Sequence, residues 1–175
     1  MTISDEVYPN SPLTEVVFEM RFLGEMAIEC RRHEFWEKIR DEYPHIFVPK
    51  NEPDQHMALQ PYRFVKEDRS SGVMIALNRF GYFASKYPGH KAFQQEFLRL
   101  SGLFGRIFPI DRLTRVGWRY VNLIPFVREN GLIPLDQFLK LGFKVPTQVP
   151  ERFKAVSLVF ESELDGGLVT TRLET

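Results

Sequence analysis

The chain has 175 residues, of which 43% are hydrophobic and 26% charged, a composition that indicates a globular protein and excludes a disordered one. Lysine plus arginine and aspartate plus glutamate each number 23, so the formal net charge of zero excludes a protein-wide basic field for nucleic acid. The single cysteine, Cys30, excludes an intrachain disulfide and a cysteine-based zinc site.

Residues 1–12 are expected to form an N-terminal lead-in, because they end in Pro-Asn-Ser-Pro, which is typical of a loop. Their acidic start lacks the apolar run of a signal peptide. No stretch of the sequence approaches the about 18 apolar residues that a membrane-spanning helix needs. We therefore expect a cytoplasmic protein.

Residues 13–110 predict a first α+β unit. Positions 13–22 alternate between apolar and charged residues, which indicates a half-buried strand. A helix is expected over 29–43, ended by Pro44, and a loop over 46–56. Residues 62–67 and 73–77 predict a hairpin around a turn at 68–72, and a short strand follows at 82–85.

A second, longer helix is predicted over residues 91–108. Its apolar residues recur at intervals of four and three, an amphipathic stripe formed by Phe93, Phe97, Leu100, Phe104 and Ile107. Gly102 and Gly105 lie inside this helix, where each costs about 1 kcal/mol relative to alanine. Either the helix packs closely on the sheet at these glycines, or the backbone of a partner approaches there.

Residues 113–124 predict a strand with two unlike faces. Val116, Trp118 and Tyr120 share one face, and Arg115 and Arg119 share the other. We expect Tyr120 to lie in the core, with its hydroxyl group reaching a partner at the edge.

Residues 111–175 predict a second, partial α+β unit, which either shares a sheet or core with the first or stands apart. A short helix is expected over 134–140, and strands over 153–163 and 168–173. Leu-Thr-x-Val occurs at both 13–16 and 113–116. We therefore predict an α+β fold with an antiparallel sheet, helices on one face and two related β-α-β-β units; the alternative is a chance match.

The second unit lacks counterparts of the last strand and helix of the first unit. The alternating pattern continues to the final residues of the sequence. This indicates an incomplete chain, and the alternative is a natural end on an edge strand.

The two matching strands carry opposite charges at corresponding positions. Glu15 and Glu19 occupy the odd face of the first, where the second has Arg115 and Arg119. We predict that they form structural charge pairs, with the strands antiparallel in the register that sets Glu15 against Arg119 and Glu19 against Arg115. Each such pair contributes about 0.2–1 kcal/mol and selects the register more than it supplies stability.

The segments Pro12 to Phe22 and Arg115 to Ile124 resemble a sporadically distributed family of uncharacterised prokaryotic proteins. Members of that family open with a Pro-Leu-x-Glu-x-x-Phe-Glu-like strand and carry an Arg-Tyr-x-Asn-x-Ile-like strand in mid-chain. The resemblance covers essentially the whole chain and implies no activity. The patchy distribution of the family implies an accessory system, such as defence or a toxin–antitoxin locus.

Candidate site residues are Arg115, Arg119, Tyr120 and Asn122 of the mid-chain strand. Either the two arginines pair with Glu15 and Glu19, or they bind an elongated anion or nucleic acid, since they stand about 13 Å apart at ~3.3 Å per residue.

No catalytic residue, metal site or cofactor is predicted. The four histidines have no metal-ligand spacing, and the sequence contains neither a phosphate-binding glycine loop nor a Gly-x-Ser-x-Gly motif. We therefore expect a non-enzymatic module that binds a protein partner or itself through a sheet edge, ahead of anion or nucleic-acid binding and, third, catalysis. No membrane partner is expected.

Overall fold

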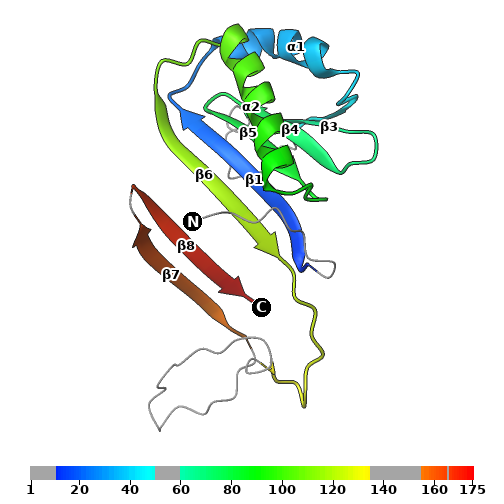
Figure 1. Ribbon diagram of the computed structural model, residues 1–175, viewed down its shortest axis with the longest axis vertical. Coiled ribbons are helices and arrows are strands. Elements are labelled where there is room, and N and C mark those ends of the chain that lie inside the picture. Colours follow the sequence, from blue (N-terminus) through cyan, green and yellow to red (C-terminus); the bar gives the residue numbers. More distant parts are fainter. Residues whose placement is uncertain (1–10, 50–59, 135–154, 165) are drawn as a thin grey trace. The chain divides into compact units, whose positions relative to one another are not determined.

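The computed structural model describes residues 11–49, 60–134, 155–164 and 166–175. The chain divides into two compact units, Met1–Leu123 and Ile124–Thr175, which are described separately (Figure 1). The predicted lead-in before residue 11, the loop from residue 50 and nearly all of the helix expected over 134–140 lie outside the described residues.

The first unit contains a six-stranded sheet in which all neighbouring strands are antiparallel, in the order β2-β3-β4-β5-β1-β6. The strands are β1 (Leu13–Phe22), β2 (His45–Phe47), β3 (Tyr62–Val65), β4 (Ser71–Ala76), β5 (Arg79–Ala84) and β6 (Leu113–Asn122). Two helices accompany them, α1 (Ala27–Ile39) and α2 (His90–Ile107). The α+β prediction is therefore confirmed.

Both helices pack on one face of the sheet, as predicted, and Figure 1 shows α2 lying over the strands. The stripe of α2 contributes Phe93, Phe97, Leu100 and Phe104 to the same core as Phe35 of α1. Phe104 lies at the centre of this core. Its ring centroid is 4.5 Å from that of Phe80 on β5, 6.0 Å from Phe35 and 5.9 Å from Phe22 on β1.

The opposite face of the sheet carries a smaller buried cluster made of Val17, Val65, Met74 and Phe83. Two glycines accommodate its large side chains across the strand pair. Gly72 is the direct partner of Phe83, and Gly81 that of Met74. A methyl group on Gly72 would stand 2.7 Å from both the Phe83 ring and the Phe64 carbonyl oxygen, so the ring occupies the space that a side chain would need.

The second unit contains a hairpin of two antiparallel strands, β7 (Ser157–Leu164) and β8 (Gly167–Glu174). Gly166 lies in the turn with φ +82°, a left-handed conformation that glycine adopts without strain. The predicted strand and its return are present, and the proposed relation of this hairpin to β3 and β4 stays a prediction.

Several expected boundaries are different in the structure. The first helix ends at Ile39, and the amides of Glu42 and Tyr43 bond back to the Ile39 carbonyl in a closing turn. Residues 46 and 47 were expected in a loop, but with residue 45 they form β2, because their backbone pairs with β3. Strand β6 belongs to the first compact unit, because it pairs along its length with β1.

The expectation that Gly102 and Gly105 serve close packing on the sheet is wrong. A methyl group on Gly105 would meet no atom within 4 Å, and one on Gly102 would meet only the Arg106 side chain at 3.9 Å. Both glycines are exposed. The approach of a partner's backbone at this position therefore stays a prediction.

Candidate interaction surface

Strand β6 is the last strand of the six-stranded sheet, and among the described residues no strand pairs with its outer edge. At its end, Leu123 donates its N–H to the Pro12 carbonyl, and the Val121 carbonyl accepts a bond from the Thr14 hydroxyl group. Odd-numbered residues of β6 therefore direct their backbone groups toward β1. The N–H and C=O groups of successive residues in a strand point to opposite edges of that strand. Those of Val116, Trp118 and Tyr120 therefore point away from β1, toward the outer edge.

The helix-side face of β6 is apolar and only partly covered. Trp118 packs against the core, with its ring 5.1 Å from Phe18 and 5.2 Å from His90, both measured between centroids. Val116 is 53% exposed and Tyr120 50% exposed. The expectation that Tyr120 lies in the core is thus wrong, because only its contacts with Trp118 and Tyr87 shield it at the border of the sheet.

The opposite face of β6 carries the two arginines. Arg119 is exposed over 69% of its side chain, and its Nη2 lies 3.5 Å from Glu15. Arg115 is exposed and forms no ion pair within the described part of the chain. The face of β6 opposite the helices therefore carries more uncompensated positive charge than the predicted charge pairs would leave.

The predicted register of these charge pairs is wrong by two residues. Arg119 stands opposite Val17, Arg115 opposite Arg21, and Glu19 opposite Gly117. Glu19 bonds instead to Arg21 at 2.6 Å and to Arg79 at 3.6 Å. A shift of two residues keeps every side chain on its face, so the charged face was predicted correctly. Glu15 and Arg119 still form the predicted ion pair, now diagonally across the strands, whereas Glu19 pairs with other arginines.

The four candidate residues do not form one site. Arg115 and Arg119 lie on the face opposite the helices, whereas Tyr120 and Asn122 follow the helix-side alternation. Asn122 is exposed at the end of the strand, opposite Leu13. The two faces of β6 therefore differ in chemistry. The helix-side face is apolar, the opposite face is cationic, and the outward-directed backbone groups lie between them.

A groove of about 300 Å³ adjoins the start of β6, between this strand and the second half of α2. Its lining is largely apolar and includes Met20 of β1 and Leu113 of β6. Ser101 and Gly105 form part of the α2 wall. The groove thus lies next to the apolar, helix-side face of β6, and small residues of α2 form part of its wall.

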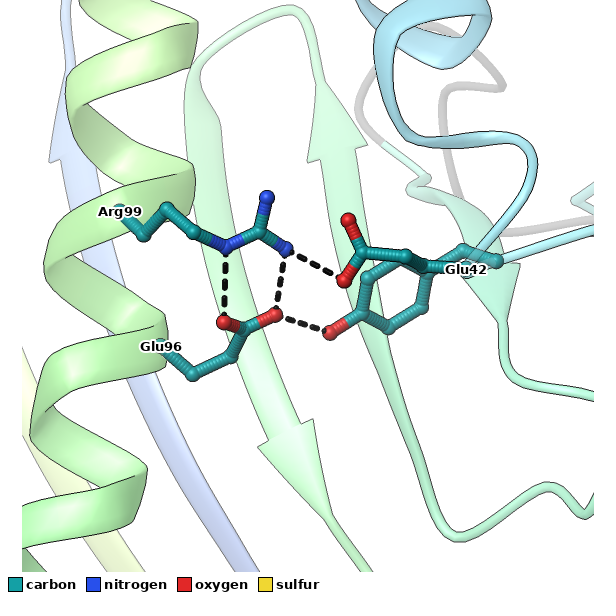
Figure 2. Close-up of polar contacts among 4 residues, drawn as sticks. Glu42, Glu96 and Arg99 are labelled. Atoms are coloured by element: carbon teal, nitrogen blue, oxygen red, sulfur yellow. Dashed lines mark hydrogen bonds and ion pairs between the residues drawn. The ribbon is translucent and has the colours of Figure 1, made fainter.

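A polar cluster that sequence reasoning missed joins α2 to the turn after α1. Figure 2 shows Arg99 between the carboxylates of Glu96 and Glu42, with Nη2 at 2.7 Å and 2.8 Å from their oxygens. The buried Tyr43 donates its hydroxyl to Glu96 at 2.6 Å. The spacing of Glu96 and Arg99 by three on a helix is a signal, but their partners come from the tertiary fold.

The pKa values in this cluster follow from burial and pairing. Burial, helped by the bond to Glu96, raises the pKa of Tyr43 well above its ordinary value, so the phenol stays protonated. Burial also acts to raise the pKa of Glu96, but the hydrogen bonds from Arg99 and Tyr43 outweigh it and lower that pKa. The cluster, which we call the latch, ties α2 to the turn after α1 through a charged glutamate and a protonated phenol.

We expect this latch to make stability depend on acid pH. The pKa of Glu96 is lower in the folded state than in the unfolded chain. Its stabilising contribution to the free energy of unfolding is therefore fully present above the unfolded pKa of about 4.3, and it is lost as the pH falls through the pKa of the folded state. The substitution Tyr43→Phe should lower the free energy of unfolding by about 1–2 kcal/mol at neutral pH. Urea unfolding should show this difference shrinking below the unfolded pKa, and a difference that is constant with pH would contradict it.

Within the described residues, no helix is long and apolar enough to cross a membrane. The same part of the chain contains no group of three or more histidine, cysteine, aspartate or glutamate residues that could hold a metal ion. Comparisons with protein-family models, curated proteins and solved structures found no match.

Proposed function

We propose that this chain is a cytoplasmic, non-enzymatic protein-interaction module that binds a partner through the outer edge of β6. The observation that carries the proposal is one ten-residue strand whose apolar and cationic faces are both exposed and whose alternate backbone groups point away from the sheet. An exposed edge strand offers unpaired N–H and C=O groups, and adding a strand there is a common mode of recognition.

The distribution of polarity along β6 supports the same proposal. Exposed large apolar residues lie along its helix-side face, namely Leu113, Val116 and Tyr120. Single exposed apolar residues are ordinary on a protein surface, but a row beside an unpaired strand edge is typical of an interface. The resemblance to an accessory prokaryotic family suggests that the partner belongs to the same defence or toxin–antitoxin locus.

The experiment is co-purification of the tagged full chain from its own host in three forms. Val116→Pro removes an outward N–H and leaves the bonds to β1 intact, because that N–H points away from β1. Val116→Ala is the matched control, since it trims the side chain but keeps the N–H. The product of a neighbouring gene should accompany the native chain and the alanine variant but not the proline variant; identical recovery with all three contradicts the proposal.

A second candidate function is binding of an anion or nucleic acid through the face opposite the helices. Register places five arginines there, Arg21, Arg63, Arg79, Arg115 and Arg119, against two glutamates, Glu15 and Glu19. Glu19 already bonds two of these arginines. If Arg115 and Arg119 alone bind single-stranded nucleic acid, log K should fall with log salt with a slope of roughly 1.4, since each phosphate contact contributes about 0.7.

A fluorescence-anisotropy titration with a single-stranded oligonucleotide at two salt concentrations decides between the candidates. Salt-dependent binding that disappears in the Arg115→Glu, Arg119→Glu double variant would favour nucleic acid. The leading proposal predicts no such binding.

A further inference from the structure

The outer edge of β6 also specifies the chemistry of the strand that it accepts. We propose that this edge receives an extended segment of another protein in which apolar residues alternate with glutamate or aspartate. The inference rests on the proposed function and deepens it, because it commits to the side chains of the partner and not only to the use of the edge.

The register of an added antiparallel strand follows from the backbone of β6. Its outward groups belong to Val116, Trp118 and Tyr120, so these residues would form the hydrogen-bonded pairs with the incoming strand. Opposite residues share a face of the sheet, and the partner residues in these pairs therefore join the apolar helix-side face. Apolar partner residues there would cover Val116 and Tyr120, which are half exposed in this chain.

The remaining residues of the incoming strand face the arginines. They stand opposite Arg115, Gly117 and Arg119 in the non-hydrogen-bonded pairs, where opposite side chains come closest. Glu19 is engaged by Arg21 and Arg79, and Glu15 meets Arg119 only at 3.5 Å. Carboxylates at these positions would supply the charge that the described part of the chain does not give to Arg115.

Strand β1, on the inner edge of β6, has part of this chemistry, although its Val17 and Arg21 stand opposite Arg119 and Arg115. Residues 15–20 of β1, Glu-Val-Val-Phe-Glu-Met, set Phe18 opposite Trp118, Val16 opposite Tyr120 and Glu19 opposite Gly117. An acidic residue opposite Gly117 lies between the two arginines. The same β6 side chains border the outer edge, so apolar residues opposite Trp118 and Tyr120 and a carboxylate opposite Gly117 are complementary there too.

A second copy of this chain fits the edge less well. Symmetric pairing of β6 with another β6 would gather four arginines on one face, where like charges are unfavourable. The strand β7 of a second copy is not complementary to the outer edge of β6 either. The Val156 carbonyl accepts a bond from the amide of Thr175, which follows β8, so the outward backbone groups of β7 belong to Val159, Glu161 and Glu163. Bonding through these residues would place both glutamates on the apolar face that carries Val116 and Tyr120.

The test measures binding of three short fluorescein-labelled peptides to the full chain. Each alternates valine or phenylalanine with one other residue, which is glutamate, threonine or lysine. The glutamate peptide should bind about tenfold more tightly than the lysine peptide, because two cross-strand contacts change from attraction to repulsion. The order should reverse in Arg115→Glu, Arg119→Glu and should flatten in the milder Arg115→Gln, Arg119→Gln, which keeps the test valid if the charge reversal misfolds.

The outcomes separate this inference from the proposed function. Equal binding of all three peptides that is lost in Val116→Pro would overturn the acidic partner and leave edge pairing standing. No peptide binding, together with partner recovery that Val116→Pro does not change, would overturn both. A stable dimer in solution that Val116→Pro dissociates would identify a second copy as the occupant and overturn the inference.

Discussion

Replacing Phe104 by alanine should lower the free energy of unfolding of the six-stranded unit by about 3–5 kcal/mol. Phe104 is 1% exposed, and its ring contacts Phe22, Phe35, Phe80 and Phe108, which come from β1, α1, β5 and the end of α2. Removing it opens a cavity where all these elements meet, and the surrounding rings cannot refill that cavity without leaving their rotamers.

Urea unfolding followed by tryptophan fluorescence measures this effect, since both tryptophans, Trp36 and Trp118, lie in the first unit. The matched control is Leu98→Ala, on the same helix but 58% exposed, which should change stability by no more than about 0.5 kcal/mol. Equal losses for the two variants would mean that Phe104 is not the centre of the core.

The substitution Gly72→Ala should destabilise the same unit by about 1–3 kcal/mol, although alanine is the better residue in an ordinary strand. The added methyl group would stand 2.7 Å from the Phe83 ring and 2.7 Å from the Phe64 carbonyl oxygen. The ring can rotate away, but the carbonyl belongs to the neighbouring strand and can move only with its backbone. The cost therefore comes from displacing β3 and from uncovering the cluster opposite the helices.

Gly105→Ala is the matched control, for which we expect a change of opposite sign in the free energy of unfolding. It adds a methyl group inside α2 where no atom lies within 4 Å, so it should stabilise the unit by about 0.5–1 kcal/mol. In thermal unfolding, Gly72→Ala should unfold at a lower temperature than the native chain and Gly105→Ala at a higher one. A loss of stability in Gly105→Ala would show that this helix face is packed in solution.

The fold class and most elements could be predicted from the sequence because alternation and helical spacing are local signals. The strand over residues 13–22 has the predicted bounds, and the long helix differs by one residue at each end. The three-residue β2 could not be found, since its only support is pairing with a strand that begins fifteen residues after its end.

The candidate site could be predicted only in part. Which residues of β6 share a face follows from a period of two, and that part is confirmed by the register. The register itself depends on irregularities at both ends of the pairing between β1 and β6, which the sequence does not reveal. The exposure of Tyr120 likewise depends on how far α2 reaches across the sheet, a property of the packed unit.

Binding of a partner strand requires that the outer backbone groups of β6 be free in the unbound protein. Residue-resolved amide hydrogen exchange of the isolated protein tests it most directly. The amides of Arg115, Gly117, Arg119 and Val121, which point to β1, should be protected, and those of Val116, Trp118 and Tyr120 should exchange rapidly until a partner strand binds. Equal protection of both sets in the unbound protein would contradict the account.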